Sequence, residues 1–142
     1  MEQSQVVLHI SDLHFCKDTT HENDARTLAL GQLVQTTAEQ PDEWHPSIIC
    51  LTGDISRHGK AADYELAAAW LTALMNRFSL PIEALFICAG NHDVDRDVAK
   101  LLARPGSAGE ADIILAFPPI SEHYSAVFEA YSECAKQFGV TP

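Results

Sequence analysis

Three short apolar runs recur along the chain, and each of them ends in a cluster of polar residues. The runs lie in QVVLHISD (5–12), SIICLTGD (47–54) and LPIEALFICAGNHD (80–93), and they are rich in residues that favour strands. Segments 21–40 and 59–78 lie between them and repeat apolar residues at helical spacing. The order strand–helix–strand–helix–strand predicts an α/β fold with a parallel sheet and right-handed crossovers.

The two predicted helices each carry an apolar face. In segment 21–40 that face contains Leu28, Leu30, Leu33 and Val34. Asn23 or Asp24 would cap the start of this helix. In the alanine-rich segment 59–78 the apolar stripe contains Leu66, Trp70, Leu74 and Phe78. Beyond the third strand, residues 104–112 are predicted to form a flexible loop, and residues 118–140 a loop followed by an amphipathic helix.

The polar clusters at the three strand ends are the main chemical feature of the sequence. In a parallel α/β sheet, ligands bind at the carboxyl ends of the strands, so these clusters are expected to meet. If the chain stays extended, Asp12 and His14 point the same way and could hold one cation. Asp54 could bridge two cations, and Asn91 adds an amide oxygen. This mixed nitrogen and oxygen set suits Mn²⁺, Fe, Zn²⁺, Co²⁺ or Ni²⁺.

The segments SDLHF, TGDIS and GNHDVDR resemble, in order and spacing, the D-x-H, G-D and G-N-H-[DE] blocks of the calcineurin-like metallophosphoesterases. The resemblance covers residues 5–97. It implies two divalent metal ions, with Asp12 and His14 on the first, Asp54 bridging both and Asn91 on the second. Water activated by the metals would then attack the phosphorus of a phosphodiester or phosphomonoester.

The resemblance also implies roles for the two residues that follow Asn91. His92 would act on the substrate, either by stabilising the transition state or by protonating the leaving oxygen. Asp93 would orient the imidazole of a histidine without itself contacting a metal ion. Asp95 and Asp97 are predicted to cap the next helix or to lie in solvent rather than to bind metal.

The chain departs from the family pattern after His92. The family supplies three more histidines there, two of them in a G-H-x-H block, whereas this chain has only His123, for which a surface or capping role is expected. The family fold packs two sheets between helical layers, an α/β/β/α sandwich. We therefore expect the β-α-β-α-β half with an incomplete second sheet, in one domain (1–142) that is truncated at its C-terminus. Such a sheet would expose apolar surface, which invites self-association or requires a missing C-terminal portion.

A second departure concerns the segment GDISRHG. The protein-phosphatase branch of the family has G-D-x-x-D-R-G, but here Arg57 and His58 replace the second Asp and the Arg. This argues against a phosphoserine or phosphothreonine phosphatase and favours the phosphodiesterase-like branches. Arg57, His58 and Arg96 are expected to be solvated loop residues. Cys50 and Cys88 are expected to be small core residues.

Composition narrows the class of protein further. The chain has 142 residues and a net charge of −11, with 20 acidic and 9 basic residues, which disfavours binding to nucleic acid through a basic face. No signal peptide and no membrane-spanning segment is predicted, and the scattered cysteines suit a reduced cytoplasmic protein. The expected partner is a phosphate-ester substrate.

Two other hypotheses stay open beside the enzyme. The first is a catalytically impaired, truncated remnant that acts as a binding or regulatory module, which the missing histidines favour. The second is a Rossmann-like nucleotide binder. It ranks last because no G-x-G-x-x-G or Walker-type loop follows any predicted strand.

Overall fold

The three predicted strands form one parallel sheet in the order β1–β2–β3. The protein is represented by a computed structural model that describes residues 5–18, 20–102, 104–116 and 125–140. Its elements are β1 (Val7–Ile10), α1 (Thr20–Ala38), η1 (Asp42–Trp44), β2 (Ile48–Thr52), α2 (Ala61–Arg77), η2 (Ile82–Ala84), β3 (Leu85–Cys88), α3 (Arg96–Ala99), α4 (Ala108–Leu115), η3 (Ala126–Phe128) and α6 (Glu129–Gln137). The described residues contain no second sheet, so the architecture is consistent with part of a metallophosphoesterase fold.

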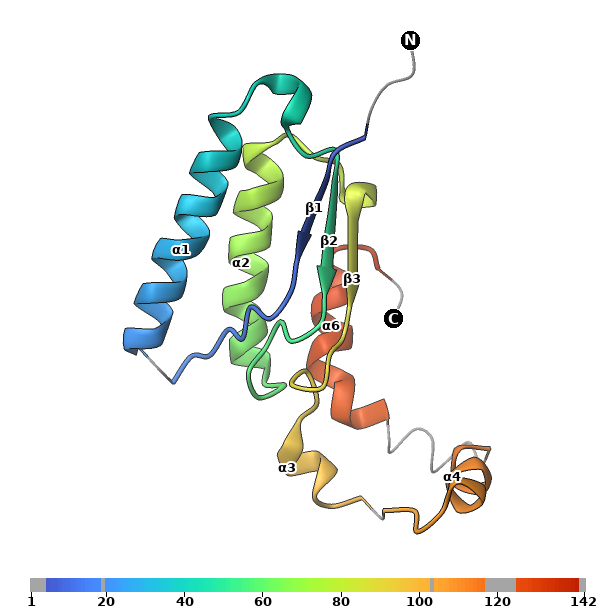
Figure 1. The fold of residues 1–142 in the computed structure, drawn as a ribbon. Helices are drawn as coiled ribbons and strands as arrows, with labels where there is room; N and C mark the ends of the chain where they lie inside the picture. Colours follow the sequence, from blue (N-terminus) through green and yellow to red (C-terminus); the bar gives the residue numbers. More distant parts are fainter. Residues whose placement is uncertain (1–4, 19, 103, 117–124, 141–142) are drawn as a thin grey trace.

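The helices α1, α2 and α6 cover one face of the sheet (Figure 1). Right-handed crossovers between strands in sequential order place the connecting helices on the same side. Alternate strand residues therefore point into one core, in which Ile49 and Leu51 of β2 are fully buried. Leu71 of α2 and Ala135 of α6 are fully buried in the same hydrophobic cluster. This core fixes the sheet, and with it the strand ends that carry the candidate site.

The opposite face of the sheet is open in the described part of the chain. Val7 and Phe86 are 51% and 58% exposed, and Cys88 is exposed as well. The prediction that Cys88 is a core residue is therefore wrong, because its side chain points to the face away from the helices. Cys50 is only half-buried for the same reason.

The structure corrects three details of the predicted helices. Helix α1 begins at Thr20, before both predicted caps, and Asn23 instead donates to the carbonyl oxygen of Cys16. Leu28 is exposed, so it does not belong to the buried face of α1. In α2 the buried face is rotated from the predicted stripe, because Leu66 is exposed. The buried residues of α2 are Asp63, Tyr64, Ala67, Leu71, Leu74 and Met75.

The region after the sheet is more helical than the sequence predicts. Residues 104–112 were expected to form a loop, but α4 already begins at Ala108. The predicted amphipathic helix is confirmed as α6, which buries Tyr131, Cys134 and Ala135. His123 lies outside the described residues. None of the described helices is both long enough and apolar enough to span a bilayer.

Candidate metal centre

The carboxyl ends of β1 and β2 bring three of the predicted ligands together. The His14 Nε2 atom lies 3.9 Å from Asp12 Oδ1 and 4.0 Å from Asp54 Oδ2. Both distances are too long for hydrogen bonds. The Asp12 side chain is 67% exposed, whereas that of Asp54 is only 15% exposed. The imidazole therefore lies between an outer and an inner carboxyl group.

The sequence suggested an extended backbone at these ligands, but the structure shows that the backbone is not extended there. Asp12, His14 and Asp54 have φ angles of 58°, 48° and 52°, in the left-handed region that residues other than glycine seldom adopt. Hydrogen bonds between the two strand ends hold this conformation: His14 N donates to the Asp54 carbonyl at 2.8 Å, and Asp12 N to the Gly53 carbonyl at 3.3 Å. Backbone strain of this kind concentrates at functional sites. The side chains converge through these turns rather than through an extended strand.

A glycine after β3 makes room for Asp54. A Cβ atom on Gly90 would lie 2.3 Å from Asp54 Oδ1 and 2.5 Å from the Asp54 backbone nitrogen. The Asp54 carboxylate also accepts a hydrogen bond from His92 N at 2.9 Å. The close approach of these two backbones therefore fixes Asp54 from the β3 side.

His92 joins the same cluster from the turn after β3. Its ring packs edge-on against the His14 ring, with 4.7 Å between the ring centroids. Its Nδ1 atom lies 3.2 Å from the Arg57 carbonyl oxygen and 3.3 Å from Arg96 Nη2. The first contact needs a proton on Nδ1 and the second needs a lone pair there, so the two contacts belong to different tautomers or protonation states of the ring.

The other two predicted site residues have different surroundings. Asn91 is exposed in the turn next to His92, and its role as a metal ligand stays a prediction. Asp93 is fully buried, and its carboxylate accepts hydrogen bonds from the backbone and from Tyr64, not from an imidazole. Its partners are Ile55 N, Ser56 N, Gly90 N and Tyr64 Oη, at 3.2, 2.8, 2.8 and 2.6 Å. Asp93 therefore joins the loops after β2 and β3 to helix α2.

The donor set fits a divalent metal ion. Ligand atoms of His14, Asp54 and His92 all lie within 4.8 Å of one another. Two ligands that each lie about 2.1 Å from one ion can be at most about 4.2 Å apart. The spacings of 3.9 and 4.0 Å around His14 Nε2 satisfy that limit.

One feature of the centre differs from an ordinary metal site. His14 Nδ1 is buried without a hydrogen-bond partner in the described structure, so its ring lacks the support that a ligating histidine usually has.

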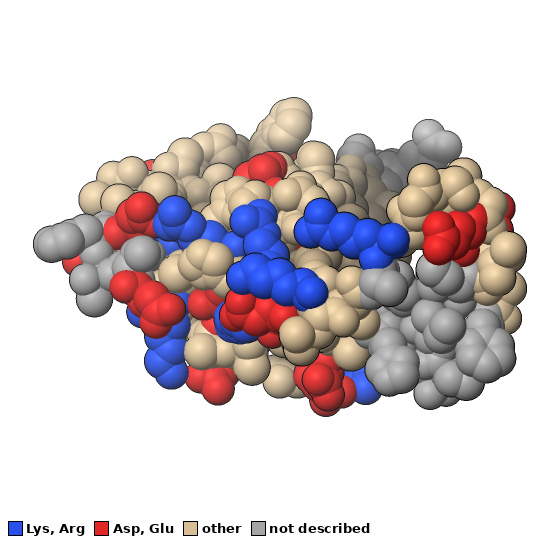
Figure 2. Space-filling view, turned by 90° about the horizontal axis from the view of Figure 1, so that it is seen from below, with Lys and Arg blue, Asp and Glu red and all other residues tan. Residues whose placement is uncertain are grey.

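Basic side chains gather beside this centre although the net charge is −11. Figure 2 shows Lys and Arg side chains across the middle of the lower face, among acidic ones. A pocket of about 330 Å³ is lined by Asp18, His58, Lys60, Arg96, Asp97 and Lys100. Hydrogen bonds to Asp95 and Asp97 raise the pKa of Lys60. The pocket therefore brings three cationic side chains, Lys60, Arg96 and Lys100, beside the candidate ligands, together with Asp18 and Asp97.

Asp95 confirms its predicted capping role. Its side chain accepts hydrogen bonds from the backbone nitrogens of Asp97 and Val98 at the start of α3. Burial raises the pKa of Asp95, but the hydrogen bonds from Lys60 and from the α3 backbone outweigh that effect and lower it.

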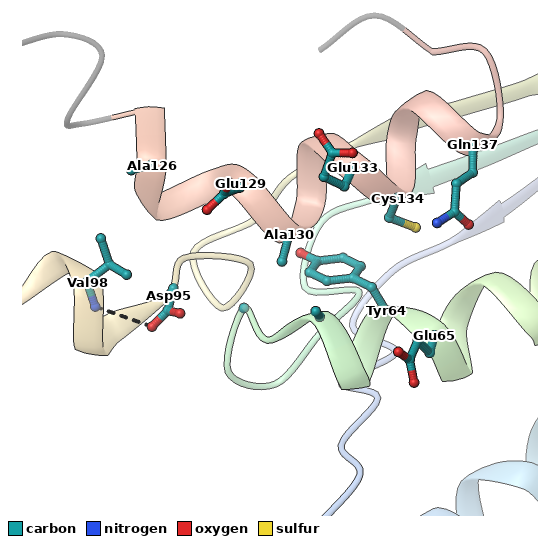
Figure 3. A pocket seen from close by; sticks show the side chains of 12 residues that line it. Tyr64, Glu65, Asp95, Val98, Ala126, Glu129, Ala130, Glu133, Cys134 and Gln137 are labelled. Atoms are coloured by element: carbon teal, nitrogen blue, oxygen red, sulfur yellow. Dashed lines mark hydrogen bonds between the residues drawn. The ribbon is translucent and has the colours of Figure 1, made fainter. Parts of the chain in front are cut away.

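A larger pocket, of about 410 Å³, lies between α2 and α6 and is lined by none of the candidate metal ligands. Figure 3 shows Tyr64 and Cys134 pointing into the space between these helices. Burial, followed by the nearby Asp93, raises the pKa of the Cys134 thiol to about 11. Glu65, Glu129 and Glu133 also line this pocket, and their charge disfavours an anionic substrate there.

Sequence reasoning missed two contacts of this region. Tyr64 was not recognised as the partner of Asp93, and no local signal could have revealed it, because the two residues are 29 positions apart. Arg96 was expected in solvent but reaches the His92 ring. Its place four residues after His92, at the start of a short helix, is the only signal that pointed to this contact.

Comparison with known proteins places this centre in a family. The family model for calcineurin-like phosphoesterases matches residues 6–140, which extends well beyond the motifs that end near residue 97. A search of curated proteins found no match. The match spans nearly all of the chain and includes every residue of the candidate centre. The chain therefore belongs to the calcineurin-like phosphoesterase family.

Proposed function

We propose that this protein is a metal-dependent phosphoesterase that hydrolyses a phosphodiester or a small phosphomonoester at a dinuclear centre. The observation that carries the proposal is the convergence of His14, Asp54 and His92, whose ligand atoms lie within 4.8 Å of one another. Asp12 and His14 would hold one ion, Asp54 both, and Asn91 the other. Family membership supports a hydrolase with a phosphate-ester substrate.

The chemistry is divided between the ions and the side chains. When bound, two divalent ions would activate water and neutralise charge on the phosphoryl oxygens. A protonated His92 would donate from Nδ1 to the Arg57 carbonyl, 3.2 Å away, and keep its other N–H for the leaving oxygen. In that state Nδ1 has no lone pair for Arg96, so the guanidinium is released to bind a phosphoryl oxygen.

The pocket beside the centre suits the rest of an anionic substrate. Lys60 and Lys100 line it but are paired with Asp97 at 2.9 and 3.0 Å. Arg96 lines it without a carboxylate partner among the described residues. We therefore propose that Arg96 is the main phosphate-binding cation of this pocket.

The second candidate is a binding or regulatory module that holds metal but turns over little substrate. It is favoured by one observation: the described residues that follow His92 contain no further histidine, so within the described ranges His14 and His92 are the only imidazoles of the centre. Metal binding without turnover would identify this function.

The test compares turnover of a generic aryl phosphodiester with added Mn²⁺ in wild type and in Asp54→Asn. Loss of the bridging carboxylate should lower activity and Mn²⁺ affinity by about a hundredfold or more, because even outer partners of a metal site matter by about 10–100-fold. Asp112→Asn, on an exposed position of α4, is the matched control and should retain both properties. Equal turnover in wild type and Asp54→Asn would overturn the proposal.

The proposal also includes the location of the protein and its domain organisation. All four cysteines are free thiols, which suits the reducing cytoplasm that we propose as the location. We also propose that residues 1–142 form a single domain, since the shared hydrophobic cluster includes residues of the sheet, α2 and α6.

A further inference from the structure

A second group of potential metal ligands lies beside the candidate centre and shares no residue with it. It consists of Cys16, His58 and Asp63, whose ligand atoms all lie within 4.8 Å of one another. Cys16 follows β1, His58 lies in the loop after β2, and Asp63 is in the first turn of α2. Three separate segments therefore bring a thiol, an imidazole and a carboxylate to one place.

Two separations within this group can be compared with those of a tetrahedral metal site. Cys16 Sγ lies 3.6 Å from His58 Nδ1, and His58 Nδ1 lies 4.0 Å from Asp63 Oδ2. Zinc bonds of about 2.3 Å to sulfur and about 2.0 Å to nitrogen place those two ligands about 3.6 Å apart. The imidazole and the carboxylate need to approach by less than about 1 Å. The His58 side chain is 45% exposed and has room to make that movement.

The buried carboxylate of this group has the hydrogen-bond support expected of a metal ligand. Cys16 is fully buried and Asp63 is 3% exposed. Asp63 Oδ1 accepts a hydrogen bond from Lys17 N at 2.9 Å, and Oδ2 accepts one from Ser56 Oγ at 3.0 Å. These bonds orient the carboxylate and still leave lone pairs on both oxygens. No Lys or Arg in the described ranges pairs with Asp63, so the carboxylate has no full positive charge beside it.

His58 connects the group to solvent. It lines the pocket of about 330 Å³ together with Asp18 and Lys60. An ion could enter from that pocket, and a water molecule could complete its coordination there. The group therefore combines two buried ligands, one ligand that can move and a path for entry.

We propose that Cys16, His58 and Asp63 form a separate binding site for a zinc-class transition metal ion. A thiolate together with an imidazole and a carboxylate favours Zn²⁺ and its analogue Co²⁺ over hard ions such as Mg²⁺ and Ca²⁺. On binding, the Cys16 thiol loses its proton to solvent and the sulfur bonds to the ion. The bound ion ties the segment after β1 to the start of α2, and thereby stabilises the loop that carries the candidate phosphoesterase centre.

Titration of the full chain with Co²⁺ tests this proposal, because only a thiolate ligand produces a sulfur-to-cobalt charge-transfer band. The candidate phosphoesterase centre contains no sulfur, so Co²⁺ bound there gives no such band. Wild type should show the band, and Cys16→Ser should lose it. Cys88→Ser, at an exposed cysteine, is the matched control and should keep it. Asp54→Asn should also keep the band, which separates this site from the proposed phosphoesterase activity.

His58→Ala provides a second test that does not depend on changing a buried residue. The variant alters a half-exposed side chain, so the fold should be retained, and Co²⁺ should bind at this site more weakly than in wild type. Absence of the band in wild type would overturn the proposal. So would a band that survives Cys16→Ser, or Co²⁺ affinity at the band that is unchanged in His58→Ala.

Discussion

The backbone at Gly90 passes so close to Asp54 that there is no room for a side chain. A Cβ atom there would lie 2.3 Å from Asp54 Oδ1 and 2.5 Å from Asp54 N. Gly90→Ala should therefore displace the carboxylate, cost about 2 kcal/mol of unfolding free energy, and weaken Mn²⁺ binding by about tenfold or more. Urea unfolding and calorimetric titration with Mn²⁺ measure the two effects.

Gly31→Ala is the matched control for this substitution. Gly31 lies in α1, and nothing lies within 4 Å of a Cβ atom added there. In a helix interior the change should stabilise the protein by about 1 kcal/mol and leave Mn²⁺ binding unchanged. If Gly90→Ala behaved like Gly31→Ala, the inference that Gly90 packs closely against Asp54 would be wrong.

Tyr64 donates one of the four hydrogen bonds that Asp93 accepts, at 2.6 Å. Burial, followed by the hydrogen bond to Asp93, raises the pKa of Tyr64, so the phenol stays a donor at neutral pH. Tyr64→Phe should lower the free energy of unfolding by about 2 kcal/mol, the typical value for a bond to a charged group. Tyr131→Phe should cost less, because Tyr131 donates to the neutral Ile87 carbonyl at 3.3 Å. Equal losses in urea unfolding would contradict the role assigned to Asp93.

At the scale of single residues, the sequence predicted which candidate metal ligands lie together better than it predicted the contacts and the backbone conformation that hold them in place. Asp12, His14 and Asp54 could be placed together because parallel strands end at one edge of a sheet. The partner of Asp93 could not be predicted, because it depends on how α2 packs over the sheet. Sequence spacing carries no information about that packing. The conformation at Asp12 and His14 was also missed, since nothing local marks a left-handed turn at residues other than glycine.

Helix α3 has only four residues and depends on side chains for its start. Asp97, in its first turn, accepts hydrogen bonds from Lys60 and Lys100, which lower its pKa to about 2 from 3.8. A carboxyl group with a lower pKa in the folded state stabilises the fold above the unfolded pKa of 3.8. That stabilisation should be lost as the pH falls from about 4 to about 2. The carboxyl carbon shift of Asp97, followed by NMR across this range, measures its pKa.

Lys60→Gln separates this network from the general effect of acid. Lys60 is the first cause of the lowered pKa of Asp97, so the substitution should return that pKa towards 3.8. Lys136→Gln removes a comparable exposed lysine, paired with Glu133 on α6, and should leave Asp97 unchanged. An Asp97 pKa that is the same in wild type and Lys60→Gln would refute the interaction.

At the scale of elements, the sequence predicted where the strands and the two long helices lie more reliably than which of their residues are buried. Strands were clear because each apolar run ends in polar residues, together with a glycine in the second and third runs. The buried face of α2 differs from the predicted one because the helix is alanine-rich. Small residues such as Ala67 pack closely against the core but do not stand out in the sequence as an apolar stripe. Helix α4 was missed because Pro105, Gly106 and Gly109 indicate a loop, yet the chain turns helical at Ala108 and Gly109 lies inside the helix.

For the whole molecule, the sheet has one face packed by helices and one that no described element covers. Phe86 is 58% exposed there, and it pairs in register with Cys50, which pairs with His9 on β1. An open apolar face of this kind promotes association. We therefore expect the protein to self-associate as its concentration rises, as the sequence had suggested from an incomplete second sheet.

Phe86→Ser should shift sedimentation towards the monomer, because it removes the largest exposed apolar side chain from the open face. If that face is open in the monomer, the same change should alter the unfolding free energy of the monomer by less than about 0.5 kcal/mol. Leu101→Ser, at a residue that is 85% exposed beyond α3, is the matched control and should leave association unchanged. A large loss of stability in Phe86→Ser without any change in association would mean that the face is covered within a single chain. The open surface would then be filled by residues outside the described ranges, and the protein would not depend on a second copy.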